Sequence, residues 1–213
     1  MQTFISETLD AILKETKSFD NVVFILPSQR AKVFLKQTLK DKISVGFLPE
    51  TLNIEQFIQQ VSGIKKADSI QLLFHFYTIY KSLEKAPDTF DTFASWAFTV
   101  LQDFNEIDQH LVDTKEIFVY LRDIQRLKKW SVTGTFKETE LMRDHNLFLE
   151  KLNIYYNAFY QFLLEKNIGY QGLMYREASK KISTYVTDTN LKKFFFIGFN
   201  ALNKAEEILI QKL

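Results

Sequence analysis

Two segments near the ends of the chain have the same pattern, an apolar run followed directly by a turn. Residues 22–26 are apolar and stop at Pro27, and residues 194–197 are apolar and stop at Gly198. Short apolar runs bounded by turn residues indicate buried strands of a parallel sheet. In folds with such sheets, ligands bind beyond the carboxyl ends of the strands. The turns after the two strands are therefore the first candidates for a functional site.

The rest of the chain carries mostly helical patterns. It has 21 Phe but only 3 Pro and 6 Gly, and so few turn-formers favour long helices with short connections. A further short strand is expected at 45–48. Helices are expected at 3–17, 28–40, 54–61, 69–84, 88–110, 114–128, 138–166, 172–186 and 203–213. We therefore predict an α/β fold that is mostly helical, with a small parallel sheet and a large all-helical insertion.

This pattern predicts a domain organisation in which one domain is interrupted by another. Residues 1–66 would form the first part of an α/β domain, residues 67–190 a helical insertion, and residues 191–213 the returning strand and helix. The apolar pattern of the last helix continues up to Leu213. From this we expect the chain to be cut from a longer protein.

Charge and cysteine content exclude several classes of function. The chain has 27 basic and 26 acidic residues, so it has no bulk attraction for nucleic acid or an acidic membrane, and binding of either would need a local patch. No stretch approaches the ~20 apolar residues of a membrane span, so we expect no membrane partner. The absence of cysteine excludes disulfides and thiol catalysis, and it is typical of a reducing cytoplasm, where we expect the protein to be.

Several short segments, in the same order along the chain, resemble the amino-terminal region of AddB/RexB-type subunits, in particular their Bacteroidetes-type branch. These subunits belong to helicase-nucleases of double-strand-break repair. The resemblance covers essentially the whole chain. The segments that carry it are residues 24–39, 47–58, 95–97, 101–108, 172–176 and 197–202.

The resemblance implies a degenerate P-loop-NTPase or superfamily-one helicase-like core whose ATPase has decayed. An active helicase has Asp-Glu after its Walker B strand, where this chain has Ile197-Gly198, and no G-x-x-x-x-G-K-[ST] phosphate loop is present. We therefore expect no ATP hydrolysis, no cofactor, no metal and no catalytic residue in this chain. The full-length protein would carry a PD-(D/E)XK nuclease domain further along. The implied partners are DNA, as a single strand or a duplex end, and an AddA-like helicase subunit.

The resemblance also points to DNA-contacting residues at the ends of the first two strands. Residues 26–30 match the helicase segment that follows the phosphate loop and touches single-stranded DNA. The candidates are Ser28, Gln29, Arg30 and Lys32, with Thr51 and Asn53 in a similar position after the second strand. The alternative interpretation is that these residues only cap helices and face solvent. The chain would then be a structural module that docks a helicase partner without touching DNA.

Two other clusters invite a functional interpretation. Asp103, Glu106 and Asp108 are too few for a hard-cation site and are expected to be surface acids or loop caps. Aromatic residues at 74–80 and 90–98 are expected to form core, the alternative being a surface that stacks bases.

Overall fold

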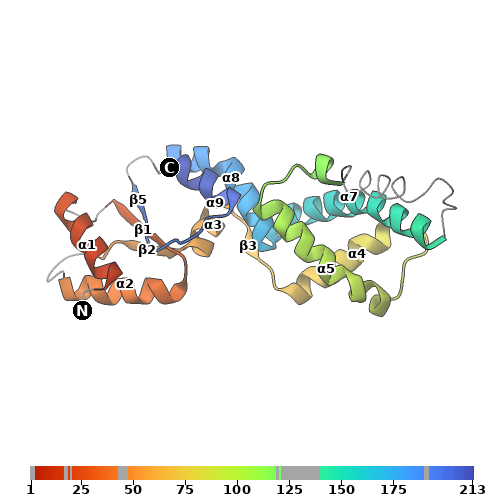
Figure 1. Cartoon of the computed structure of the whole chain (residues 1–213), viewed down its shortest axis with the longest axis horizontal. Coiled ribbons are helices and arrows are strands. Elements are labelled where there is room, and N and C mark those ends of the chain that lie inside the picture. Colours follow the sequence, from red (N-terminus) through yellow and green to blue (C-terminus); the bar gives the residue numbers. More distant parts are fainter. Residues whose placement is uncertain are drawn as a thin grey trace, which may run out of the picture. The chain divides into compact units, whose positions relative to one another are not determined.

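A three-stranded parallel sheet joins the two ends of the chain in the computed structural model, which describes residues 3–16, 19, 21–42, 48–118, 120, 140–189 and 192–213. The strand order is β2 (Glu50–Asn53), β1 (Val22–Leu26), β5 (Lys193–Phe196), as Figure 1 shows. Every residue of β1 is buried, as expected for a central strand covered on both faces. The prediction of a mostly helical α/β protein with a small parallel sheet is confirmed.

Helices α1 (Phe4–Glu15) and α2 (Gln29–Lys42) cover one face of this sheet. Side chains alternate between the faces of a strand, so every second residue of β1 points toward these helices. The resulting apolar core consists of Leu9, Ile12, Val22, Phe24, Leu26, Leu35, Leu39 and Ile197. The predicted helices 3–17 and 28–40 correspond to α1 and α2.

Helix α3 (Ile54–Ser62) provides a second apolar cluster of the sheet. The fully buried ring of Phe57 lies 6.0 Å from the ring of Phe194 and 5.9 Å from that of Phe196, both in β5. The ring of Tyr185 in α8 (Gln171–Asp188) is also 6.0 Å from Phe57. The chain then ends with α9 (Lys204–Gln211).

The second strand differs from its prediction. Residues 45–47 of the predicted strand 45–48 lie outside the described residues, and Leu48 belongs to no strand. The strand that pairs with β1 is Glu50–Asn53, in the register Leu26 opposite Asn53. As an edge strand β2 has one neighbour in this sheet, so it does not need the continuous apolar run that marks β1.

Three long helices, α4 (Ser69–Leu83), α5 (Phe90–Gln109) and α7 (Glu140–Lys166), make up most of the remaining structure. They confirm the predictions of helices at 69–84 and 88–110 and, from residue 140 on, at 138–166. Of the helix predicted at 114–128, residues 114–118 and 120 are helical and the others lie outside the described residues. A two-stranded parallel pair, β3 (Lys65–Lys66) and β4 (Ile168–Gly169), is too short to leave a sequence pattern.

The contacts divide the chain into two units. The α/β unit comprises Met1–Gly63 and Glu177–Leu213, and the helical unit comprises Ile64–Arg176. The sequence predicts the corresponding boundaries at 66 and 190. The later boundary differs because residues of α8 after Arg176 pack within the α/β unit. Lys181 Nζ, for example, donates a hydrogen bond of 2.6 Å to the carbonyl oxygen of Ser62.

The helical unit has an aromatic core. Phe76 is fully buried, and its ring lies 5.2 Å from that of Phe93 and 5.1 Å from that of Phe159. Burying one such side chain contributes roughly 2–3 kcal/mol. The prediction that the aromatics form core is confirmed for Phe76, Tyr80 and Phe93, whereas Phe74 is 54% exposed.

A buried carboxylate fixes the end of α5. Asp108 has no exposed surface and accepts hydrogen bonds from Tyr156 Oη at 2.5 Å, Tyr170 Oη at 2.6 Å and Arg176 Nε at 2.5 Å. Burial raises the pKa of the Asp108 carboxyl, and the two tyrosine hydroxyls and the guanidinium act against this rise. The prediction of a surface acid or loop cap is wrong for Asp108, because its partners lie far along the chain. Asp103 is exposed, as predicted.

One turn of α8 approaches the same part of α5 closely. The backbone N–H of Gly172 donates to Asn105 Oδ1 at 2.7 Å. A Cβ atom at Gly172 would lie 2.1 Å from the carbonyl oxygen of Asn105, so only glycine fits. Residues 101–108 and 172–176, which are far apart in the sequence, therefore contact each other in the fold.

Candidate nucleic-acid interface

The loops after β1 and β2 meet at the carboxyl edge of the sheet. Asn53 Nδ2 donates a hydrogen bond of 3.3 Å to Gln29 Oε1, and Lys32 Nζ donates one of 2.8 Å to Gln56 Oε1. Parallel pairing of the two strands brings their ends to the same place, since Leu26 and Asn53 are register partners. We call this surface the carboxyl-edge ridge and define it as Ser28, Gln29, Arg30, Lys32, Asn53 and Gln56.

Two residues of the ridge begin the helices that follow. The backbone N–H of Ala31 donates to Ser28 Oγ at 3.2 Å, which satisfies one free amide at the start of α2. Asn53 forms a capping box with Gln56, because Gln56 N donates to Asn53 Oδ1 at 2.7 Å and Asn53 N donates to Gln56 Oε1 at 3.1 Å. Ser28 and Asn53 thus both cap helices, as the alternative interpretation of the sequence expects. The side chains of Ser28 and Asn53 are already hydrogen-bonded to backbone N–H groups. Binding of a ligand at the ridge would therefore depend on its basic residues.

Arg30 is the basic residue of the ridge that is free to bind an anion. Its side chain is exposed, and its guanidinium carbon lies 5.7 Å from the centre of the Phe34 ring. Within the part of the chain that the structure describes, no carboxylate forms an ion pair with Arg30. A guanidinium supported by a ring face and without a counter-charge is suited to a phosphate oxygen.

A row of lysines continues from the ridge along α2. Lys32, Lys36 and Lys40 are four residues apart and therefore lie on one side of the helix. Partial burial lowers the pKa of Lys32, and the charge of the neighbouring Lys36 lowers it further. Because these two ammonium groups repel each other, an anion that contacts both of them would reduce the repulsion. Helix α2 has five basic residues and one acid, Asp41, so its field is positive.

Thr51 does not belong to this surface. It lies inside β2, is 6% exposed, and its hydroxyl donates to the carbonyl oxygen of Pro49 at 3.1 Å. The sequence places Thr51 after the second strand, and that placement is wrong because the strand runs on to Asn53. Its side chain is accordingly not available to a ligand at the ridge.

The end of β5 lies at the same edge. Ile197 is buried and its N–H donates to the carbonyl oxygen of Ile25 at 3.0 Å. Gly198 has φ +80°, a conformation that other residues rarely adopt, and a Cβ there would lie 4.0 Å from Pro27 Cδ. The sequence from Ile197 to Asn203 contains no carboxylate. Among the described residues, no group of three His, Cys, Asp or Glu side chains that could hold a metal ion is found.

The structure also contains a pocket that the sequence did not indicate. It lies within the helical unit and includes Glu84 and Lys151, whose side chains are 2.5 Å apart. The two residues are separated by 67 positions and lie on patterns typical of ordinary helices. No local signal in the sequence links them.

Comparison with known proteins identifies no relative, since no family model and no curated protein sequence matches the chain. In the portion described by the structure, every helix is too short or too polar to cross a membrane.

Proposed function

We propose that this chain is a non-catalytic, helicase-like region that guides DNA within a nuclease subunit of double-strand-break repair and recombination. The observation that carries the proposal is the carboxyl-edge ridge. Two loops, 24 residues apart, are hydrogen-bonded into one exposed surface. This surface leads into the lysine row of α2 and bears Arg30, which forms no ion pair with any carboxylate among the described residues. Contacts to a DNA backbone need such basic side chains and require no phosphate-hydrolysing residues.

The arrangement of the chain is compatible with a degenerate helicase core. Its α/β unit is built from two segments of sequence that flank the helical unit, and β5 returns to pair with β1 in parallel. In this proposal the helical unit is an insertion, and the position after β5 has lost the Walker B carboxylates. The nuclease domain would lie beyond this chain, and an AddA-like helicase would be the motor.

The test is a titration of the 213-residue chain into fluorescently labelled single-stranded DNA and tailed duplex DNA, measured as anisotropy at low and at physiological salt. We expect binding that requires the single-stranded tail and weakens as salt rises. For single strands the slope of log K against log salt is about 0.7 per phosphate contact. The slope therefore counts the contacts that the surface makes.

Arg30→Gln tests the ridge itself. Loss of one phosphate contact should weaken binding and reduce the salt slope by about 0.7. Lys193→Gln is the matched control, because it removes one exposed positive charge at the opposite end of the sheet, where β5 begins. Equal effects of the two variants would show general charge attraction and would contradict a site at the ridge.

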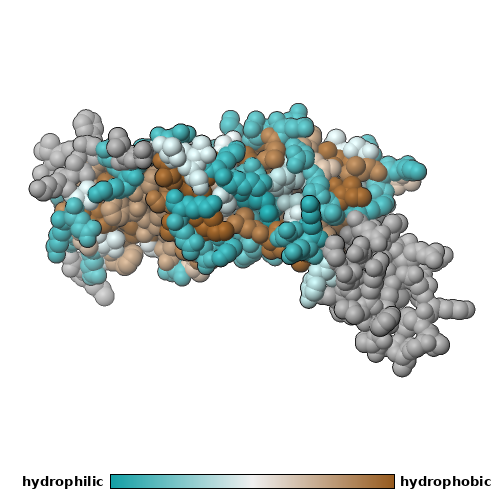
Figure 2. Space-filling model, turned by 90° about the horizontal axis from the view of Figure 1, so that it is seen from above, coloured by the Kyte–Doolittle hydropathy of each residue, from teal (hydrophilic) through white to brown (hydrophobic). Residues whose placement is uncertain are grey.

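A second candidate function is a structural module that docks a helicase partner and does not touch DNA. Apolar side chains that reach the surface of the helical unit favour it, including Ile70, Phe74 and Phe98 at 63%, 54% and 46% exposure. On the face seen in Figure 2, hydrophobic residues lie among hydrophilic ones. Complete absence of DNA binding at low salt would reject the first proposal and leave this one.

A further inference from the structure

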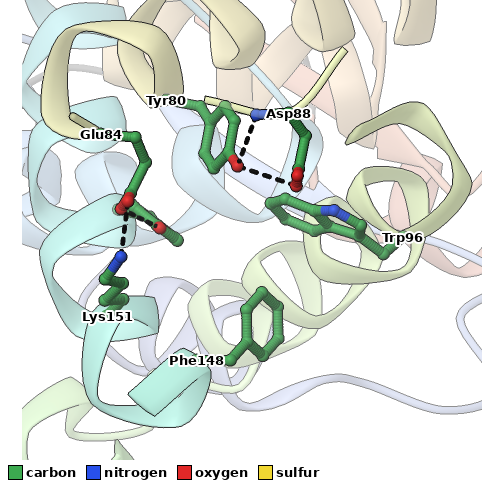
Figure 3. A pocket seen from close by; sticks show the side chains of 7 residues that line it. Tyr80, Glu84, Asp88, Trp96, Phe148 and Lys151 are labelled. Atoms are coloured by element: carbon green, nitrogen blue, oxygen red, sulfur yellow. Dashed lines mark hydrogen bonds and ion pairs between the residues drawn. The ribbon is translucent and has the colours of Figure 1, made fainter. Parts of the chain in front are cut away.

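The pocket of the helical unit combines aromatic rings with carboxylates. Its volume is about 380 Å³, within the range of sites that bind small molecules or single side chains. As Figure 3 shows, it is bordered by residues from the end of α4, from the connection to α5, and from α5 and α7. Six of the lining residues are Tyr80, Glu84, Asp88, Trp96, Phe148 and Lys151. None of them belongs to the carboxyl-edge ridge, so the inference below does not depend on the proposed function.

The apolar walls of the pocket are held in place by ring contacts. The Trp96 indole meets the Phe148 ring edge to face at 5.2 Å and the Tyr80 ring at 5.6 Å. Trp96 and Phe148 are both partly exposed, whereas Tyr80 is 6% exposed. Rings that contact one another in this way have fixed orientations, so the walls are formed before a ligand arrives.

Both carboxylate oxygens of Glu84 are already hydrogen-bonded within the protein. One of its oxygens accepts a hydrogen bond of 2.5 Å from Lys151 Nζ, and the other accepts one of 2.5 Å from Tyr155 Oη. The side chain of Glu84 is only 14% exposed, so this ion pair is largely sheltered from water. Lys151 is therefore already neutralised within the protein.

Asp88 is different, because none of the described residues supplies a counter-charge to it. Tyr80 Oη donates to one of its oxygens at 2.9 Å, which fixes the carboxylate beside Trp96 (Figure 3). Across the residues that the structure describes, no basic side chain pairs with Asp88. The pocket thus holds two carboxylates and one engaged ammonium, and it carries a net negative charge.

We propose that this pocket binds an organic cation, namely an ammonium or guanidinium group on a carbon stem. The faces of Trp96 and the neighbouring rings attract such a group, and Asp88 supplies the opposite charge. The apolar walls of the pocket can contact the carbon stem of an organic cation. A hydrated metal ion has no such stem and would not use these walls. Nucleotides are disfavoured, because their phosphates would approach a negatively charged site. Either a basic side chain of a partner protein or a free polyamine has the required chemistry.

Tryptophan fluorescence gives a direct assay. The chain has two tryptophans, and Trp130 lies outside the described residues, so Trp130→Phe leaves Trp96 as the sole reporter. The full chain is titrated with acetyl-arginine amide, acetyl-lysine amide, spermidine, adenosine and the neutral acetyl-citrulline amide. We expect saturable changes in Trp96 emission with the cations, at concentrations at least about threefold lower than with the citrulline derivative. Preference for spermidine would assign the site to free polyamines, and preference for the amino-acid amides to a partner's side chain.

Two variants complete the test. Asp88→Asn should weaken binding of the arginine derivative by about threefold, the size typical of an exposed ion pair. Phe148→Leu should weaken it further by removing one wall of the pocket. Glu165→Gln, which removes an exposed acid of α7 outside the pocket, should change nothing. Equal binding of arginine and citrulline derivatives, unchanged binding by Asp88→Asn, or saturation by adenosine alone would overturn the proposal.

Discussion

Replacing Asp108 by asparagine should strongly destabilise the protein. The carboxylate is completely buried and binds three donors, from Tyr156, Tyr170 and Arg176. Asparagine has nearly the same volume, so the change removes charge and one acceptor without creating a cavity. The amide would also place an N–H group against groups that are themselves donors.

The expected loss of stability depends on which partners of Asp108 are left without an acceptor or a counter-charge. Breaking a buried ion pair costs about 3–5 kcal/mol, because the remaining charge is left without compensation. Arg176 keeps two acceptors, the carbonyl oxygens of Ile107 and Val112, and its side chain is 16% exposed. Both features reduce the cost, while a tyrosine hydroxyl left without an acceptor adds about 1 kcal/mol or more. We expect Asp108→Asn to lower the free energy of unfolding by about 3 kcal/mol.

Urea denaturation followed by far-UV circular dichroism measures this loss. Asp103→Asn is the matched control, since Asp103 lies on the exposed side of the same helix and should change stability by less than about 0.5 kcal/mol. A double-mutant cycle with Tyr156→Phe should give a coupling energy of at least about 1 kcal/mol. Equal effects of the two aspartate variants, or full additivity with Tyr156→Phe, would refute the reasoning.

The pH dependence of Glu84→Gln and the effect of Gly172→Ala test two further features. Burial raises the pKa of Glu84, but the Lys151 ammonium and a tyrosine hydroxyl together leave it below the usual 4.5. The carboxylate therefore stabilises the fold above about pH 4.5, and this contribution is lost as pH falls through the lower pKa of the folded state. The stability advantage of wild type over Glu84→Gln should shrink as the pH falls below about 4.5 in urea titrations, and an advantage that grows on acidification would contradict this sign. For Gly172→Ala, a Cβ 2.1 Å from the Asn105 carbonyl oxygen should cost about 3 kcal/mol of stability. Gly63→Ala, where no atom lies within 4 Å but φ is +73°, should cost only about 1 kcal/mol, and equal losses in thermal melts would reject the steric account.

Helix ends were the most predictable feature of this chain. The helix predicted at 54–61 corresponds to α3, and its ends at Asn53 and Gly63 are residue types whose side-chain or backbone preferences act within one turn of a helix. The central strand at 22–26 was equally clear, because burial on both faces leaves an uninterrupted apolar run. The position of the edge strand was predicted wrongly. Thr51 and Asn53 are polar residues of the kind that follow a strand, but Thr51 lies within β2 and only Asn53 caps a helix.

The candidate interface was predictable in part. The sequence indicated both loops, because each follows a strand and begins a helix. It could not show that Gln29 bonds to Asn53 and Lys32 to Gln56, since these contacts depend on how two strands are paired.

The sequence by itself determined most of the helices that the structure describes, the central strand and the basic character of α2, because these depend on neighbours a few residues apart. Only the tertiary structure decided which distant residues meet. From the sequence, Asp108 is expected to be a surface acid, but in the fold it pairs with Arg176, 68 positions later. Glu84 likewise contacts Lys151 only because α4 and α7 pack together. Periodicity encodes which side of a helix is buried, but it does not encode the partner helix. A buried charge needs that partner to offset its desolvation, so the pocket and the buried ion pair become visible only in the folded chain.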